Sequence, residues 1–358
     1  MTYREQTRRI QIGGIAVGGG APVSVQSMTS SDTRDAEATL SQIRALAVAG
    51  CEIVRVAVPD EAAAAALPAI VEGAGLPVVA DIHFDHRLAL SAIGAGCAGL
   101  RLNPGNIGGE DRIAAVAEAA LERGVPIRVG VNAGSLEPDL LDAQGHATAE
   151  AMVRSAERHL ALLEARGLSA IKVSLKASDA ARTLAANRLW AEHHDLPLHL
   201  GLTEAGTRLL GAVRSAAVLG VLLAEGIGDT IRVSLAADPV EEVRVGLELL
   251  RTLGLREGGL RVVACPTCGR CAERFDVAGI AERVEARLSA LEVSRPLTVA
   301  VMGCAVNGPG EAREADLGVA GGDRMAVLFR RGGKVGRLGL DEVEDRLVEE
   351  VEALLADV

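Results

Sequence analysis

Short apolar runs rich in valine and isoleucine alternate with amphipathic stretches rich in alanine and leucine along the first 250 residues. Strands that alternate with helical stretches are typical of βαβ units in a parallel sheet. Several runs follow an "AG" or "LP" break, which suits a helix end leading into a strand. The expected strands are 23–28, 52–58, 77–83, 99–104, 126–132, 170–175, 197–203 and 230–235.

The number of runs bears on the kind of parallel sheet. Eight βα units over roughly 250 residues fit a closed (β/α)8 TIM barrel. The alternative is an open doubly wound sheet, but no GxGxxG turn follows the first run. We therefore expect an α/β chain whose residues 1–257 form a TIM barrel that binds the substrate.

The pattern changes after residue 257. A segment rich in glycine and cysteine leads into a helical stretch over 278–293, and an apolar strand, "LTVAVMG", precedes the loop "CAVNGPGE". Further short apolar runs and an acidic amphipathic helix over 339–358 complete the chain. This order predicts a smaller α+β domain over 258–358, with a cysteine loop at the end of each of two strands.

Composition narrows the partners and the location. Only five of 358 residues are aromatic and the net charge is -11, which argues against nucleic acid as a partner. The polar start "MTYREQTRRI" has no apolar region behind it, and no apolar run is long enough for a membrane span. We expect a cytoplasmic protein, in which six cysteines indicate metal or redox chemistry rather than disulfides.

Polar side chains lie in or just after the expected strands, where the active site of a TIM barrel is built. One interpretation is structural, with the arginines paired to Asp81, Glu204 and similar acids. The other is a polyanion site, because guanidinium groups match phosphate oxygens and the cations would exceed the local acids. The excess favours a diphosphate ligand. The basic residues concerned are Arg55, Arg101, Arg128, Lys176 and Arg232.

The cysteines of "CPTCGRC" and "GCAVNGPGE" are the candidate metal ligands. No histidine follows residue 199, which leaves an all-cysteine zinc site or an iron–sulfur cluster. A CxxC pair with one remote ligand is a common cluster arrangement, and glycines around Cys304 allow close backbone approach. These residues favour a cluster over zinc.

The chain resembles the bacterial 4-hydroxy-3-methylbut-2-enyl diphosphate synthases of the non-mevalonate isoprenoid pathway. Ten stretches carry the resemblance, in order and at compatible distances. They are "PVSVQSMTSSDTRD", "GCEIVRVAVPD", "VADIHFD", "LRLNPGNIG", "RVGVNAGSL", "KVSLKASD", "PLHLGLTEAG", "EGIGDTIRVSLAADPVEEV", "CPTC" and "GCAVNGPGEA".

The resemblance implies a homodimeric oxidoreductase in which a 4Fe-4S domain closes over the partner's barrel. Its substrate would be 2-C-methyl-D-erythritol 2,4-cyclodiphosphate, reduced by two electrons from flavodoxin or ferredoxin. The implied cluster ligands are Cys265, Cys268, Cys304 and Glu311, and Glu204 is the implied acid near the reacting carbon. Substrate contacts carry over to Arg55, Arg101, Arg128, Asn132, Lys176, Arg232 and Ser234, and we expect His83 to face the same site.

Cys271 departs from the family pattern, which has a non-cysteine residue there. An all-cysteine cluster with Cys271 in place of Glu311 is therefore an alternative, although the intact "NGPGE" stretch favours Glu311. Two other functions stay open at this point. One is a redox-inert barrel similar to dihydropteroate synthase with a structural zinc domain, and the other is a non-catalytic iron–sulfur sensor or scaffold.

Overall fold

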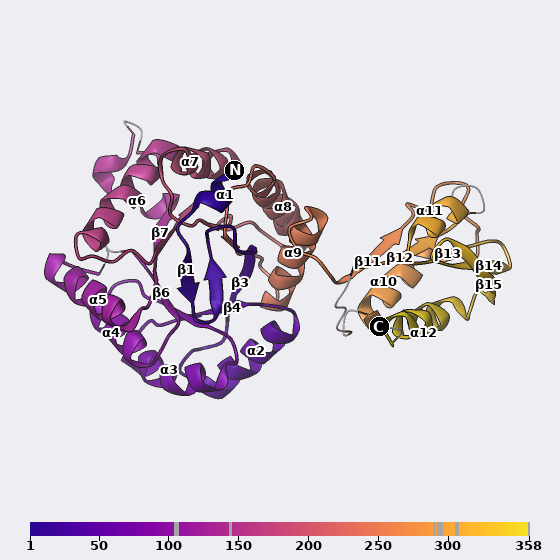
Figure 1. The fold of residues 1–358 in the computed structure, drawn as a ribbon, viewed down its shortest axis with the longest axis horizontal. Helices are drawn as coiled ribbons and strands as arrows, with labels where there is room; N and C mark the ends of the chain where they lie inside the picture. The colour runs from indigo at the N-terminus through magenta and orange to yellow at the C-terminus, as the bar shows by residue number, and fades with distance from the viewer. Residues whose placement is uncertain (104–106, 143–144, 289–290, 292–295, 305–307, 357–358) are drawn as a thin grey trace. The chain divides into compact units, whose positions relative to one another are not determined.

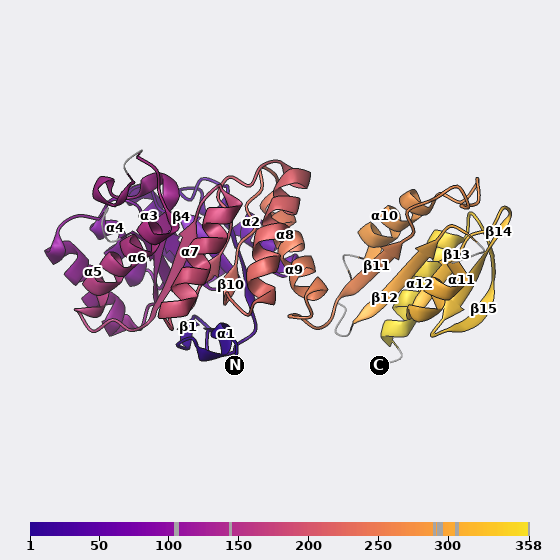
Figure 2. The same cartoon turned by 90° about the horizontal axis from the view of Figure 1, so that it is seen from above.

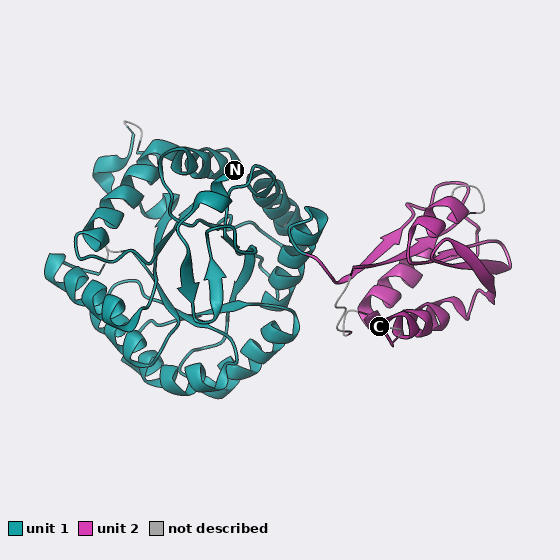
Figure 3. Cartoon of the chain, in the orientation of Figure 1, with its two compact units in different colours: residues 1–256 teal, residues 257–358 magenta. Residues whose placement is uncertain are grey.

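The computed structural model describes residues 1–103, 107–142, 145–288, 291, 296–304 and 308–356. The chain divides into two compact units, residues 1–256 and residues 257–358 (Figure 3). None of the helices within these described ranges is long and apolar enough to cross a membrane.

The first unit is a barrel of eight parallel strands (Figure 1). A bridge between Val173 and Leu198 joins the two ends of the sheet, so the TIM barrel expected from the sequence is confirmed. Each strand begins within about two residues of its predicted start. The strands are β3 (Ser24–Met28), β4 (Ile53–Ala57), β5 (Val78–Asp81), β6 (Gly99–Leu102), β7 (Ile127–Asn132), β8 (Ile171–Lys176), β9 (His199–Leu200) and β10 (Thr230–Ile231).

A ring of helices surrounds the strands and buries their outward-facing apolar side chains (Figures 1 and 2). Aspartates cap several of these helices by accepting a backbone N–H of the first turn, as Asp35, Asp60 and Asp179 do. The helices are α2 (Ala36–Val48), α3 (Glu61–Gly73), α4 (His86–Gly94), α5 (Glu110–Arg123), α6 (Ala149–Glu164), α7 (Ala180–His193), α8 (Arg208–Ala224) and α9 (Pro239–Thr252).

An N-terminal plug, residues 3–17, covers the amino end of the barrel (Figures 1 and 2). It consists of α1 (Tyr3–Gln6) and an antiparallel hairpin of β1 (Ile10–Ile12) and β2 (Ile15–Val17). The hairpin packs its isoleucines and Val17 against Ile53 and Val79 inside the barrel. This plug was not predicted from the sequence.

The second unit is a five-stranded sheet with helices, as expected for an α+β domain. The strands β11, β12 and β13 are parallel, and β14 and β15 add antiparallel to them. The cysteine loops follow β11 and β12. The elements are β11 (Leu260–Ala264), α10 (Val277–Leu288), β12 (Leu297–Met302), α11 (Gly308–Glu314), β13 (Leu317–Ala320), β14 (Met325–Arg330), β15 (Gly333–Gly339) and α12 (Val343–Ala356).

Candidate active site

A pocket of about 220 Å³ opens at the carboxyl ends of the barrel strands. Side chains alternate across each strand, so every second residue points into the barrel. All eight predicted binding residues come together here, from six strands and the segments that follow them. The lining residues are Arg55, Asp81, His83, Arg101, Arg128, Asn132, Ser174, Lys176, Thr203, Arg232 and Ser234.

Asp81 is the acid shared by two of the pocket arginines. Its carboxylate lies 3.6 Å from Nε of Arg55 and 3.2 Å from Nη1 of Arg101. The ring of His83 lies 3.2 Å from the same Nη1 atom. Burial alone would raise the pKa of Asp81, but Arg55, His83 and Arg101 together hold it well below its usual range. Asp81 is therefore ionised and fixes two guanidinium groups at the pocket wall.

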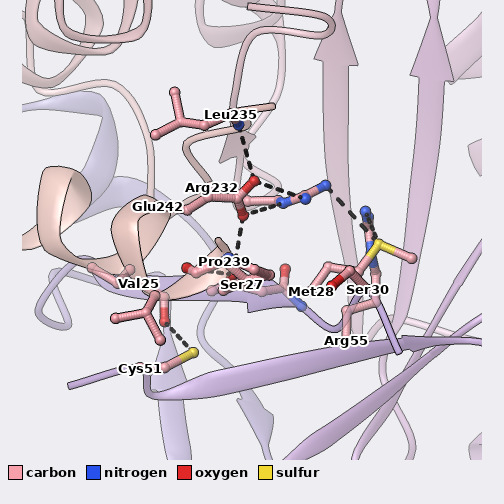
Figure 4. A network of polar contacts seen from close by, with 12 residues as sticks. Val25, Ser27, Met28, Ser30, Cys51, Arg55, Arg232, Leu235, Pro239 and Glu242 are labelled. Atoms are coloured by element: carbon pink, nitrogen blue, oxygen red, sulfur yellow. Dashed lines mark hydrogen bonds and ion pairs between the residues drawn. The ribbon is translucent and has the colours of Figure 1, made fainter. Parts of the chain in front are cut away.

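Arg232 is held by a second acid, Glu242 of α9, which the sequence analysis did not nominate (Figure 4). Both oxygens of Glu242 accept from Arg232, at 3.2 Å each, and Leu235 N and Ser27 Oγ donate to them at 3.0 Å. Glu242 is 3% exposed, so a helix supplies a buried counter-charge to the barrel interior. Ser27 faces this helix layer rather than the pocket.

The remaining pocket cations have no carboxylate partner. Arg128 is 2% exposed, and its Nη1 donates to Oε1 of Gln26 at 3.4 Å. Among the residues that the structure describes, neither Arg128 nor Lys176 forms an ion pair. Five cations therefore face two carboxylates at this pocket, so the expected excess of positive charge is present.

Burial and mutual repulsion act on these cations. Burial lowers the pKa of Arg55 to about 10, against an opposing effect of Asp81, and Arg232 and Arg101 lower it further. Burial also lowers the pKa of Arg128 well below its ordinary value, followed by repulsion from Arg55 and Arg101. An anion bound here would relieve repulsion that the free pocket does not compensate.

Glu204 lies just outside the pocket. It follows Thr203, which lines the pocket, but its own side chain is exposed and is not part of the lining. Its φ of 53° is in the left-handed region, which is uncommon for a residue with a side chain. Such conformations concentrate at functional sites and turns. The structure thus places Glu204 at the pocket mouth in a strained backbone conformation.

The two cysteine loops of the second unit lie side by side, because β11 and β12 are paired and parallel. Gly303 N donates to Sγ of Cys265 at 3.2 Å, and Ala272 N donates to the Gly303 carbonyl at 2.8 Å. Backbone N–H groups aimed at thiolates are typical of iron–sulfur sites. Within the described ranges, no three ligand side chains are already gathered around a metal position.

The four cysteines of these loops, Cys265, Cys268, Cys271 and Cys304, are partly or fully exposed, so they can act as ligands. Cys271 is not apart from the others, since a Cβ built on Gly303 would collide with its sulfur and come within 3.4 Å of Sγ of Cys265. Glu311 is exposed in the first turn of α11, and residues 305–307 before it lie outside the described residues. The donor set fits a cluster bound by thiolates with a carboxylate or a fourth thiolate.

The chain matches two family models, the GcpE TIM-barrel domain over residues 7–247 and the GcpE protein C-terminal domain over residues 261–353. It is 58% identical to a 4-hydroxy-3-methylbut-2-en-1-yl diphosphate synthase (flavodoxin) of Geobacter sulfurreducens, covering 99% of both chains. A protein of the same description from Maridesulfovibrio salexigens is 54% identical, over all of this chain and 99% of its own.

A solved structure that shares the barrel is the dihydropteroate synthase of Yersinia pestis, with a TM-score of 0.51. It is 15% identical and covers 69% of this chain and 97% of its own. At this identity the likeness concerns the fold alone.

Proposed function

The chain belongs to the GcpE family, and from this premise we propose that it is a 4-hydroxy-3-methylbut-2-enyl diphosphate synthase. It opens the ring of 2-C-methyl-D-erythritol 2,4-cyclodiphosphate and removes a hydroxyl. The step takes two electrons and two protons, and it yields the allylic diphosphate and water. The observation that carries the assignment to this pocket is its uncompensated positive charge at the barrel mouth.

The basic residues of the pocket fall into two groups: those that a carboxylate already orients, and those without a carboxylate partner. Arg55, Arg101 and Arg232 are oriented by Asp81 and Glu242, so their forks are in place before the ligand arrives. Among the described residues, Arg128 and Lys176 form no ion pair with a carboxylate, so a bound diphosphate would be the first negative group to pair with them. A charge-assisted hydrogen bond contributes about 1.5–3 kcal/mol net. Asn132, Ser234 and His83 offer uncharged polar contacts at the same wall.

We assign Glu204 the protonation of the departing hydroxyl. Its position beside Thr203 at the cationic mouth supports this role. Glu204→Gln should abolish turnover while the cyclodiphosphate still binds. Glu192→Gln, in the exposed last turn of α7 at the opposite end of the barrel, is the matched control and should keep both. Normal turnover by Glu204→Gln would remove Glu204 from the mechanism.

We further propose that Cys265, Cys268, Cys304 and Glu311 hold a 4Fe-4S cluster. Such a cluster would supply single electrons and a Lewis-acidic iron. A carboxylate is a harder and more readily displaced ligand than a thiolate, so Glu311 would be the ligand that can leave one iron open. On the side of the protein, the backbone N–H of Gly303 stabilises the Cys265 thiolate.

Partners and location follow the same assignment. The curated relatives are described as flavodoxin enzymes, and we propose flavodoxin, with ferredoxin as the alternative, as electron donor here.

A homodimer is supported by an exposed apolar stripe on α8, formed by Leu209, Leu210 and Val213 at 73%, 54% and 59% exposure. Six cysteines with no disulfide framework fit a reducing compartment, so we place the enzyme in the cytoplasm.

One assay tests the proposal as a whole. Anaerobically purified protein should be brown, bleach with dithionite, and convert the cyclodiphosphate when given reduced flavodoxin. A colourless protein that contains zinc would overturn the assignment in favour of a redox-inert barrel. A brown protein that does not bind the cyclodiphosphate would instead indicate a sensor or scaffold.

A further inference from the structure

The chain uses arginine almost everywhere it needs a positive charge. Of its 37 basic residues only three are lysines, namely Lys172, Lys176 and Lys334. Lys172 and Lys176 both lie on β8 and are 3% and 7% exposed, whereas Lys334 is exposed on β15 of the other unit. The difference matters because lysine can lose its proton inside a protein and arginine does not.

Lys172 lies inside the barrel, one tier below the pocket. Lys172, Ser174 and Lys176 are spaced two residues apart along β8, so their side chains point to the same face of the strand. Ser174 and Lys176 line the pocket, and Lys172 therefore also points into the barrel. Its strand neighbour in the register is Arg128. Within the described residues its Nζ atom is buried and has no hydrogen-bond partner. A buried ammonium without a partner is costly, so this amine is held neutral in the free protein.

Lys176 lies above it against Gly201. A Cβ at that glycine would come within 2.5 Å of Nζ of Lys176, so the glycine makes room for the amine. Burial lowers the pKa of both lysines well below the ordinary value, and the nearby guanidinium of Arg128 lowers it further. Only Asp229, beneath the pocket, acts on Lys172 in the opposite sense.

Near these amines, β3 contributes the uncharged Gln26. Asp81 of β5 is shared by Arg55 and Arg101, and Arg232, just after β10, is paired with Glu242. Burial lowers the pKa of His199 on β9 well below its ordinary value, and its ring adds no negative charge. The titratable and charged groups that face the lysines are Arg55 of β4, Asp81 of β5, Arg101 of β6, Arg128 of β7, His199 of β9, Arg232 just after β10, and Asp229 and Glu242 outside the strands.

We propose that Lys172 takes up a hydrogen ion when the diphosphate binds, so that substrate binding at this site is coupled to protonation. The inference rests on the proposed function, because it needs a doubly anionic ligand at the pocket. The bound anion supplies negative charge that the free pocket lacks, and the Lys172 amine then becomes an ammonium ion. Lys172, which is not part of the pocket lining, thereby becomes a positioning residue that adds attraction from below.

The sign of the pH dependence follows from linkage. Between the pKa of a lysine in the free protein and its higher pKa in the complex, the complex holds more protons. Binding therefore weakens as pH rises through that window. For each proton taken up, the Kd rises by up to about tenfold per pH unit.

Isothermal titration calorimetry of the holoenzyme, without reductant, measures the uptake directly. The cyclodiphosphate is titrated at one pH into PIPES and into Tris, whose ionisation enthalpies differ. Each phosphorus of this ligand has a single, strongly acidic hydroxyl, so the ligand itself binds no proton near neutrality. We expect uptake of roughly one proton by the unaltered protein. A heat that does not depend on the buffer would overturn the proposal.

Variants assign the proton to residues. Lys172→Met keeps an unbranched side chain one atom shorter and removes its titration, so uptake should fall and the pH dependence of Kd should flatten. Lys334→Met, the matched control, should behave as the unaltered protein. Unchanged uptake in a folded Lys172→Met would overturn the role of Lys172. The calorimetry of the unaltered protein decides the question even where that variant fails to fold.

Failure of this inference can be told from failure of the proposed function. If the protein converts the cyclodiphosphate but binds it without proton uptake, the proton coupling is refuted and the proposed function is retained. P1,P2-dimethyl diphosphate is a diester with no ionisation near neutrality. If it binds with proton uptake while the cyclodiphosphate is not converted, the function falls and the lysine coupling stands.

Discussion

Glu242→Gln is the perturbation that most sharply tests how the barrel tolerates its arginines. The substitution keeps the size of the side chain and removes its charge. Glu242 is 3% exposed and is the carboxylate that pairs with Arg232, through two contacts of 3.2 Å. Without it, Arg232 joins the cations that already lack a carboxylate partner, and the amide nitrogen of the glutamine faces a donor at either Leu235 or Ser27.

The size of the effect can be bounded from the structure. Removing one partner of a fully buried pair costs about 3–5 kcal/mol. The Arg232 side chain is 19% exposed, so solvent screens its charge and we expect a smaller loss, about 2–3 kcal/mol. For a domain of this size, each kcal/mol shifts Tm by roughly 2–4 °C. The variant should melt roughly 5–10 °C below the unaltered protein.

Thermal unfolding followed by circular dichroism, with and without the cyclodiphosphate, is the assay. The bound cyclodiphosphate should reduce the difference in Tm between Glu242→Gln and the unaltered protein, because its negative charge offsets the Arg232 charge that the variant leaves uncompensated. Glu241→Gln is the neighbouring control, since Glu241 pairs with Arg208 and Arg244, which are 72% and 56% exposed. That variant should melt within about 2 °C of the unaltered protein. Equal melting of the two variants would refute the reasoning.

Three further outcomes are expected. Gly201→Ala should weaken cyclodiphosphate binding by roughly tenfold or more in calorimetry. The reason is that the new Cβ would lie 2.5 Å from Nζ of Lys176 and displace it. Unchanged affinity would contradict the close packing of Lys176 against Gly201. Cys271→Ser should keep the iron content and EPR signal that Glu311→Ala loses, and the reverse result would make Cys271 the fourth ligand. Burial raises the pKa of Asp229 to about 6, so the folded protein binds this proton more tightly than the unfolded chain. Stability should therefore fall as pH rises from about 4 to 6, by up to about 3 kcal/mol, and Asp229→Asn should flatten that part of a urea unfolding series.

The fold was largely predictable because each barrel strand is a separate apolar run between helical stretches. The arginines of the pocket were predictable for a related reason. Each lies inside such a run, as Arg55 does in "EIVRVAV", where a charge is too costly unless the fold gives it a purpose. Since parallel strands end at one face, their polar residues had to meet there.

What the sequence did not reveal depends on contacts between distant segments. Glu242 belongs to an amphipathic helix with many acids, and nothing local distinguishes it from Glu241 beside it. The plug was missed although "IQIGGIAV" contains two short apolar runs around a Gly-Gly turn, a hairpin signal. Lys172 was overlooked beside Lys176, although its even spacing from the latter places both on one face of β8.

The plug also determines where a tag or tether can be attached to the protein without blocking the pocket. It is tied to the closed end of the barrel by a bond from Arg4 N to the Gly226 carbonyl, at 2.9 Å, and by one from Thr7 Oγ1 to Asp229, also at 2.9 Å. Met1 projects from this end and is 99% exposed. A purification tag or surface tether attached at the amino terminus would therefore sit a full barrel length from the pocket mouth. Immobilised enzyme prepared in this way should keep its substrate entrance clear.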